Sequence, residues 1–310
     1  MPRYPRWLTR PWSPDGVVRE VRTLVEDLKL HTVCESARCP NLAECFSQRQ
    51  LTFMILGSRC TRSCRFCAVD HGRPEPVAPD EPWRVAEAVK RLGLQHVVIT
   101  SVARDDLADE GAGHFVEVIR VVRRENPGIS VEVLVPDFHA RAPLVHQLLH
   151  EGRPEVFAHN VETVERLSPL LRPQAGFARS LAVLALAAGA KTGSLIKSSL
   201  MVGLGETVEE LTCTYEALRA VGVTHLTIGQ YLRPDAHHLP VMEYLSPARF
   251  RLYEQLAYDA GLVWVTAGPF VRSSYHASQA LAALPPVPPV PPDVSAIGEE
   301  RMSCSTSRSV

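Results

Sequence analysis

The amino-acid sequence predicts an α/β fold, a partial TIM-like barrel of (β/α)6 type with an extension at each end. From residue 51, short β-rich runs alternate about six times with stretches of helical period. The runs are largely apolar, which favours a parallel sheet. The loop after the first run, residues 57–79, far exceeds the usual two to six residues of a βα connection. The chain therefore divides into an N-terminal extension (1–50), a barrel (51–270) and a C-terminal segment (271–310).

Runs of β-branched and other apolar residues predict six strands. They are Leu51–Leu56, His96–Thr100, Ser130–Val135, Glu155–His159, Ser194–Val202 and His225–Leu232. Amphipathic helices are expected between them, with starts at Asp80, Thr207 and Ser246. The pattern is compatible with a partial or a closed barrel, and in either case functional residues are expected in the loops that follow the strands.

The composition excludes several classes of protein. The chain has 33 basic and 34 acidic residues and a net charge of −1, so we expect neither nucleic acid nor a membrane as a partner. It contains no apolar run of about 18 residues and no secretory signal, which favours a cytoplasmic location. The proline-rich stretch from Pro285 to Pro292 predicts a disordered tail, and a docking site for a proline-binding module is the alternative.

Cysteine usage gives the first chemical information. Six of the eight cysteines lie between positions 34 and 67, whereas Cys213 and Cys304 stand apart and are expected to have no metal role. In a reducing compartment, thiols clustered at short spacing bind metal more often than they form disulfides.

One group of cysteines lies in the long loop after the first predicted strand. Cys60, Cys64 and Cys67 have Cys-x3-Cys-x2-Cys spacing, which can hold a cubane iron-sulfur cluster and leave one iron without a protein ligand. An open iron can bind a small molecule. The alternative is a structural zinc site, which needs four ligands. His71 is the nearby candidate for the fourth ligand.

A second group lies upstream, where Cys34, Cys39 and Cys45 have Cys-x4-Cys-x5-Cys spacing. Six thiolates are too many for one cluster, so the sequence predicts two. On spacing alone, the second cluster could simply brace the N-terminal extension.

The loop cysteines and Phe66 beside them resemble the radical S-adenosylmethionine (SAM) superfamily, and the two groups in this order resemble the lipoyl synthase family. The likeness runs from about Trp7 to about Ala277. It includes Leu51–Gly57, Val97–Val102, Glu132–Phe138, Leu200–Glu206, Leu226–Leu232 and the Arg-Ser-Ser-Tyr motif at Arg272–Tyr275.

The resemblance implies a mechanism and its cofactors. These are SAM and two 4Fe-4S clusters, one of which cleaves SAM to a 5'-deoxyadenosyl radical while the auxiliary cluster donates sulfur. The implied reaction inserts two sulfur atoms, at C6 and C8 of a protein-bound octanoyl-lysine. In the family the second serine of the motif, here Ser274, ligates the auxiliary cluster.

Partners follow from the same resemblance. They are octanoylated lipoyl carrier proteins (the glycine cleavage H protein or the E2 lipoyl domains of 2-oxoacid dehydrogenases), a low-potential electron donor such as ferredoxin or flavodoxin, and an iron-sulfur carrier for cluster repair.

Polar residues near the ends of predicted strands are candidate contacts to SAM or substrate. They are Arg104, Asp105, Asp106, His159, Asn160, Lys197, Glu206 and Gln230. For each of them alone, a solvated loop charge or a helix cap is the alternative. Two positions depart from the family pattern: Ala103 replaces an acid and Ala158 replaces an asparagine.

Two other functions compete with this interpretation. Another radical SAM sulfur-inserting enzyme would lack the upstream cysteine group and the motif serine. A non-enzymatic iron-sulfur electron carrier would close all four ligand positions and would need no barrel.

Overall fold

The computed structural model describes residues 4–9, 16–275 and 277–282. Within these ranges one sheet contains eight strands in the order β1 to β8. The strands are β1 (His31–Thr32), β2 (Thr52–Ile55), β3 (His96–Ser101), β4 (Ser130–Leu134), β5 (Val156–Ala158), β6 (Leu195–Val202), β7 (His225–Gln230) and β8 (Trp264–Gly268).

Strands β2 to β8 run parallel, and β1, the outermost strand, pairs antiparallel with β2. Among the described residues the pairing runs from β1 to β8 without closing on itself. The carboxyl ends of the seven parallel strands therefore meet at one edge of the sheet, and their amino ends meet at the other. The open barrel confirms the predicted fold class.

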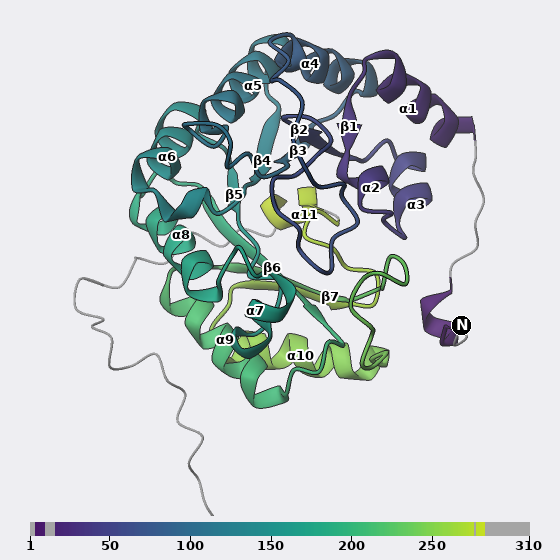
Figure 1. Ribbon diagram of the computed structural model, residues 1–310, viewed down its shortest axis with the longest axis vertical. Helices are drawn as coiled ribbons and strands as arrows, with labels where there is room; N and C mark the ends of the chain where they lie inside the picture. The colour runs from purple at the N-terminus through teal and green to yellow at the C-terminus, as the bar shows by residue number, and fades with distance from the viewer. Residues whose placement is uncertain (1–3, 10–15, 276, 283–310) are drawn as a thin grey trace, which may run out of the picture.

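Helices form a ring outside the strands, and Figure 1 shows α4, α5, α6, α8, α9 and α10 along its outer side. The helices are α1 (Gly16–Asp27), α2 (Val33–Ser36), α3 (Leu42–Ser47), α4 (Glu81–Leu92), α5 (Ala112–Glu125), α6 (Ala142–Gln147), α7 (Ser168–Leu171), α8 (Phe177–Gly189), α9 (Val208–Ala220), α10 (Pro247–Asp259) and α11 (Ala277–Ala282). The predicted capping box of Thr207 and Glu210 begins α9, and Ser246 caps α10.

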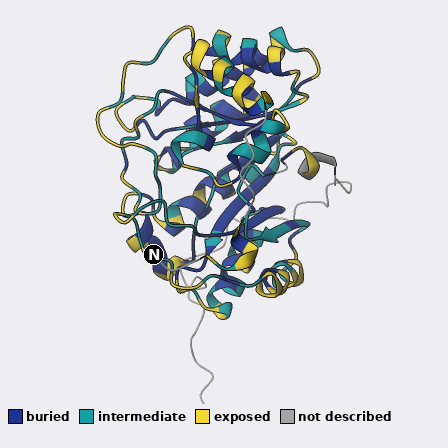
Figure 2. Cartoon of the chain, turned by 90° about the vertical axis from the view of Figure 1, so that its right-hand side faces the viewer, coloured by how far each residue is buried: buried dark blue, intermediate teal, exposed yellow. Residues whose placement is uncertain are grey.

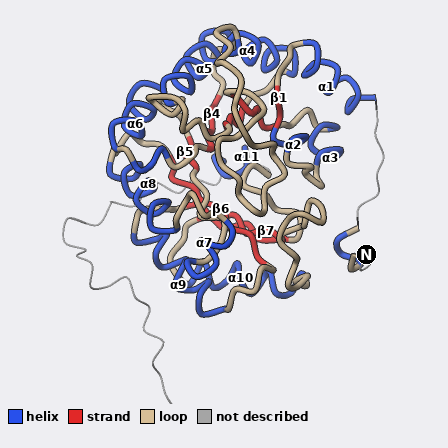
Figure 3. The backbone as a smooth tube through the Cα atoms, viewed as in Figure 1, coloured by secondary structure: helices blue, strands red, loops and turns tan. Residues whose placement is uncertain are grey.

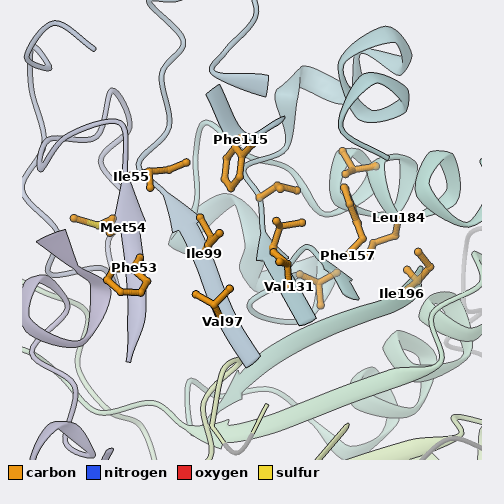
Figure 4. Close-up of a cluster of buried hydrophobic side chains, with 14 of the residues drawn as sticks. Phe53, Met54, Ile55, Val97, Ile99, Phe115, Val131, Phe157, Leu184 and Ile196 are labelled. Atoms are coloured by element: carbon orange, nitrogen blue, oxygen red, sulfur yellow. The ribbon is translucent and has the colours of Figure 1, made fainter. Parts of the chain in front are cut away.

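The core lies between the strands and the helix ring. In Figure 4, Phe115 of α5 lies on the helix side of β3, and Leu184 of α8 lies beside Phe157 of β5 and Ile196 of β6. Figure 2 shows buried residues on the strands and exposed residues on the outer helix faces. Along β2, Phe53 and Ile55 alternate with Thr52 and Met54, so the two pairs face opposite sides of the sheet.

The two extensions meet at the open side of the barrel. After β8 the chain turns back across β7, where a Cβ at Gly229 would overlap the carbonyl oxygen of Val271. The Asn41 side chain donates a hydrogen bond to the Phe270 carbonyl (2.6 Å), and the Tyr275 hydroxyl donates one to Glu44 (3.1 Å). The segment ends in α11, which contacts β3 and appears in the middle of the ring in Figure 3.

All six predicted strands are present, with ends shifted by up to two residues. The sequence analysis missed β1, which has only two residues, and β8, in which only Val265 is buried. Neither strand is long or apolar enough to produce a periodic signal. The proline-rich stretch and Cys304 lie outside the described residues, and Cys213 lies on α9.

Candidate metal centres

The loop between β2 and α4 brings Cys60, Cys64 and Cys67 together at the carboxyl edge of the sheet. All three are free thiols and line one cavity of about 90 Å³, together with the apolar side chains of Met54 and Val102. The Cys60 Sγ accepts hydrogen bonds from two backbone amides, those of Arg62 (3.4 Å) and Ala103 (3.3 Å). Three thiols thus line one largely apolar cavity. Hydrogen bonds to sulfur are one of the factors that set the reduction potential of an iron-sulfur cluster.

A buried guanidinium fixes this loop to the sheet. Arg62 lies between two of the cysteines and is only 6% exposed. It binds Asp105 after β3 through two nitrogens (2.7 and 2.9 Å) and Asp137 after β4 (2.8 Å). Burial tends to raise the pKa of the Asp137 carboxyl, but the charge and hydrogen bond of Arg62 outweigh it and lower the pKa below its ordinary value. The loop is therefore held by charged groups in the segments that follow two strands.

Backbone contacts hold the rest of the loop. The amide of Arg65 donates to the Leu171 carbonyl (2.8 Å), and the amide of Ser63 donates to the Gln174 side chain (3.0 Å). The His238 ring is hydrogen-bonded to the Cys67 carbonyl (3.0 Å). Segments that follow β3, β4, β5 and β7 thus all contact the loop.

The second group lies at the amino edge of the parallel strands. Cys34 is in α2, Cys39 lies between α2 and α3, and Cys45 is in α3. All three are free thiols and line an open cavity of about 340 Å³ with Ser274 and Thr52. The Thr52 hydroxyl donates a hydrogen bond to the Ser274 Oγ (2.9 Å). Four candidate donors from both extensions therefore share one cavity.

Strand β2 links the two sites. Thr52 lines the cavity of the upstream cysteines, and Met54, two residues later on the same face, lines the cavity of the loop cysteines. Two residues along a strand correspond to about 7 Å. The two cysteine groups therefore lie at opposite edges of one sheet, with one short strand between them.

Burial affects three of the thiols. It raises the pKa of Cys34 and of Cys67 to about 12 and that of Cys64 to about 11. These thiols stay protonated at neutral pH without metal, so loading of a metal must displace protons.

Comparison with known proteins identifies the family. The sequence pattern of the Radical SAM superfamily matches residues 54–218. The lipoyl synthase of Rubrobacter xylanophilus is 52% identical over 276 residues, which are 89% of this chain and 85% of the relative. That of Caldanaerobacter subterraneus is 48% identical over 281 residues, 90% of this chain and 98% of the relative. The chain belongs to the lipoyl synthase family.

Two solved structures share the fold. The FeFe-hydrogenase maturase HydG from Carboxydothermus hydrogenoformans superposes with a TM-score of 0.55 at 13% identity, over 86% of this chain and 77% of that one. Streptococcus suis SuiB, solved with SAM bound, also gives 0.55, at 12% identity, over 74% of this chain and 54% of that one. As a radical SAM enzyme, this lipoyl synthase family member uses SAM and an iron-sulfur cluster.

The family also bears on the zinc alternative. His71 lines the same cavity as the loop cysteines and pairs with Cys60 as a β-bridge, so geometry alone does not exclude a fourth nitrogen donor. Three thiols fit a cluster that leaves one iron open, and membership of the lipoyl synthase family favours this interpretation over zinc.

The predicted contact residues after β3 form ion pairs within the protein. Arg104 is buried and holds Asp106 through two nitrogens (both 2.9 Å), and it also donates to the Leu56 carbonyl (3.0 Å). Asp105 accepts from Arg62 and from the Thr61 hydroxyl (2.9 Å). These three residues fix the loop that carries the cysteines.

The candidate contact residues at the carboxyl ends of β5, β6 and β7 also form hydrogen bonds within the protein. Glu206 accepts from the amides of Gly203 (2.6 Å) and Leu204 (2.9 Å), and burial raises the pKa of its carboxyl. Gln230 donates to the Glu243 carbonyl (2.9 Å). Asn160 donates to Glu162 (3.0 Å), whereas its buried Oδ1 has no hydrogen-bond partner among the described residues.

Lys197 and His159 are both buried. Lys197 is 1% exposed and pairs with Glu132 on β4 (2.8 Å), near the amino end of β6 instead of in a loop. His159 bonds to the Val135 carbonyl (2.9 Å) and to Ser180 (3.0 Å). Burial lowers the pKa of His159 to about 4, so its imidazole is neutral at pH 7.

The two departures from the family pattern differ in position. Ala103 lies beside the loop cysteines, with its amide on the Cys60 sulfur and its carbonyl accepting from Thr61. Ala158 is buried at the end of β5, between Leu134 and Lys197 in the sheet.

Sequence reasoning missed Arg62, Asp137 and Thr52. Arg62 carried a signal, because an arginine flanked by two metal-binding cysteines adds charge where a cluster must be supported. Thr52 carried none, since a threonine at the start of a strand is an ordinary strand residue.

Within the described residues, none of the helices combines the length and the apolar composition that crossing a membrane requires.

Proposed function

We propose that this chain inserts two sulfur atoms, at C6 and C8 of a protein-bound octanoyl-lysine, to give the lipoyl group, and that it does so with two 4Fe-4S clusters. Cys60, Cys64 and Cys67 would hold one cluster, and SAM would bind at the coordination position that they leave open. The other cluster would be held by Cys34, Cys39, Cys45 and Ser274. The observation that carries this proposal is the presence of two separate cysteine groups at the two edges of one barrel, joined by β2.

When bound, SAM and its cluster supply hydrogen abstraction, and the auxiliary cluster supplies sulfur. The residues of the chain provide the metal ligands and the walls of the site. Three thiols in the loop leave one coordination position open for SAM. Met54, Val69 and Val102 give this position apolar walls, and a water-poor site protects a reactive carbon from side reactions.

The candidate contacts are proposed with different roles. Asn160 is the strongest candidate for a contact to SAM or substrate, because within the described part of the chain its buried Oδ1 has no hydrogen-bond partner. Glu206 and Gln230 shape the same edge through backbone hydrogen bonds. Arg104, Asp105 and Asp106 support the cysteine loop, and Lys197 with Glu132 forms part of the inner barrel wall.

We further propose three functional segments. The extension 1–50 and the C-terminal segment 271–310 supply the auxiliary cluster ligands, and the barrel 51–270 supplies the radical SAM site.

Partners follow from the proposed reaction. Its substrate is an octanoylated lipoyl carrier protein, either the glycine cleavage H protein or an E2 lipoyl domain. Reductive cleavage of SAM consumes electrons, so a low-potential donor such as ferredoxin or flavodoxin is required. Loss of sulfur from the auxiliary cluster requires an iron-sulfur carrier for its repair.

The deciding experiment is anaerobic reaction of the reconstituted protein with SAM, a reductant and an octanoyl-lysyl peptide. We expect a peptide mass gain that corresponds to two sulfur atoms, and two molecules of 5'-deoxyadenosine for each product. SAM cleavage without any sulfur in the peptide would contradict the proposal.

A further inference from the structure

Thr52 occupies an unusual position between the barrel and both extensions. It is the first residue of β2 and is only 3% exposed. Its side chain points into the cavity lined by the upstream cysteines. It cannot itself serve as a fifth donor to a four-iron cluster that already has three thiolates and a serine, so its hydroxyl needs another explanation.

One hydrogen bond connects Thr52 to a candidate ligand that is far away in sequence. Its hydroxyl donates to the Ser274 Oγ (2.9 Å), in the C-terminal segment, 222 residues away. Helix α2, which carries Cys34, packs against β2, and Thr52 lines the same cavity as Cys34. One residue of the sheet thus shares a cavity with candidate ligands from both extensions and binds one of them.

We propose that Thr52 is a positioning residue for the auxiliary cluster: its hydroxyl orients the Ser274 Oγ so that a free lone pair of this oxygen points to iron. This inference rests on the proposed function, because it takes Ser274 as the ligand. Serine has a freely rotating χ1, and a donor anchored on a strand removes that freedom. Residues that hydrogen-bond to metal ligands fix the orientation of those ligands, and their loss commonly weakens metal affinity by 10- to 100-fold.

A purely structural role for Thr52 makes a different prediction. The C-terminal segment is also held by Asn41 on the Phe270 carbonyl and by Tyr275 on Glu44. If Thr52 only anchored this segment, loss of either neighbouring hydrogen bond would have the same effect on the cluster. If Thr52 orients the ligand, its hydroxyl affects the serine-bound iron specifically.

The experiment uses the full chain with Cys60→Ala, Cys64→Ala and Cys67→Ala, so that every signal comes from the auxiliary cluster. Thr52→Val removes the hydroxyl at similar volume, and Thr52→Ser keeps it. After anaerobic reconstitution with ⁵⁷Fe, Mössbauer spectra report the oxygen-ligated iron, and a chelator in solution measures the rate of iron release. We expect Thr52→Val to lose the distinct signal of that iron and to release iron about tenfold faster, and Thr52→Ser to restore both.

Two controls complete the test. Tyr275→Phe removes a neighbouring hydrogen bond of the same segment and should leave the oxygen-ligated iron signal in place. In a Ser274→Ala background, Thr52→Val should add no further increase in iron release, because the ligand that it orients is gone. The proposal is wrong if Thr52→Val keeps the parent spectrum and release rate, if Thr52→Ser behaves like Thr52→Val, or if the two substitutions add independently.

These readouts do not depend on catalysis. Failure of the octanoyl-peptide reaction in the parent protein would overturn the proposed function, whereas an unchanged spectrum in Thr52→Val would overturn only the role of Thr52.

Discussion

The two cysteine sites are built in opposite ways. The loop site is local in sequence and is fixed by a buried ion-pair network, in which Arg62 binds both Asp105 and Asp137. The site at the amino edge takes its donors from both extensions, and hydrogen bonds of Asn41, Thr52 and Tyr275 hold the C-terminal segment there. In the proposed function the loop site cleaves SAM repeatedly and benefits from rigidity, whereas the site at the amino edge gives up sulfur and must be opened and rebuilt.

The largest expected effect is at the loop site. Cys64→Ala should abolish 5'-deoxyadenosine formation, because two thiolates cannot hold the site-differentiated cluster. Iron content should fall to about half, since the auxiliary cluster is held by other residues. Chromatographic detection of 5'-deoxyadenosine together with iron and sulfide analysis checks this. Normal SAM cleavage would show that these cysteines are not the ligands.

Replacement of an upstream cysteine should separate the two sites. Cys39→Ala should still cleave SAM but give no lipoyl product, because sulfur supply depends on the other cluster. Mass spectrometry of the peptide and quantitation of 5'-deoxyadenosine in one reaction measure both halves. A lipoyl product from protein whose auxiliary cluster is verified absent would contradict the donor assignment.

The serine pair sharpens the comparison. Thiolate binds iron more firmly than a hydroxyl oxygen, so Ser274→Cys should keep the cluster and SAM cleavage yet stall sulfur insertion. Ser273→Ala should be mild. Product counts at matched cluster content test this. Parent-like yield from Ser274→Cys would remove the case for a labile serine, and an inactive Ser273→Ala would move the ligand one residue back.

Substitution of Gly229 tests how the C-terminal segment packs against β7. In Gly229→Ala, the new methyl group would overlap the Val271 carbonyl oxygen and push the segment that carries Ser274 away from β7. We expect auxiliary cluster content and product yield to fall several-fold, with SAM cleavage retained. Gly189→Ala is the control, because nothing lies within 4 Å of its new methyl group. Equal iron loss in both variants would argue against a specific effect of the segment.

The smallest expected effect is a pH-dependent change in stability. Asp137→Asn breaks a buried ion pair with Arg62 and should lower the free energy of unfolding of the metal-free protein by about 3 kcal/mol at pH 7. The pKa of Asp137 is lowered in the folded protein, so its contribution is present above the ordinary value of about 3.9 and is lost as the pH falls towards the folded pKa.

Guanidinium unfolding of parent and variant at pH 7 and near pH 3.5 measures this difference. It should shrink at the lower pH. Glu151→Gln removes an exposed pair with Arg120 and should change stability little at either pH. An equal gap at both pH values would show that the Asp137 charge is not what stabilises the loop.

The sequence predicted most of what is local. Spacing identified both cysteine groups, and hydrophobic runs located six strands, because each signal lies within a short window. It could not predict that Thr52 meets Ser274, since 222 residues separate them and neither has a distinctive local pattern. It also could not distinguish ligand contacts from internal ones: Arg104 and Lys197 were candidates for SAM or substrate, and both form ion pairs within the protein. The same charged groups serve either purpose, and only the fold decides which.

The distribution of donors along the chain also orders the events of biosynthesis. The loop cysteines, with Asp105 and Asp137, belong to the first half of the chain and can be made long before translation ends. The cavity at the amino edge is complete only when the segment around Ser274 has been synthesised and has packed against β7 at Gly229. A nascent chain that stops before that segment would carry three cysteines in an unfinished cavity. If Ser274 ligates the proposed auxiliary cluster, that site can be completed only after β2 and β7 have formed and the C-terminal segment has packed against them.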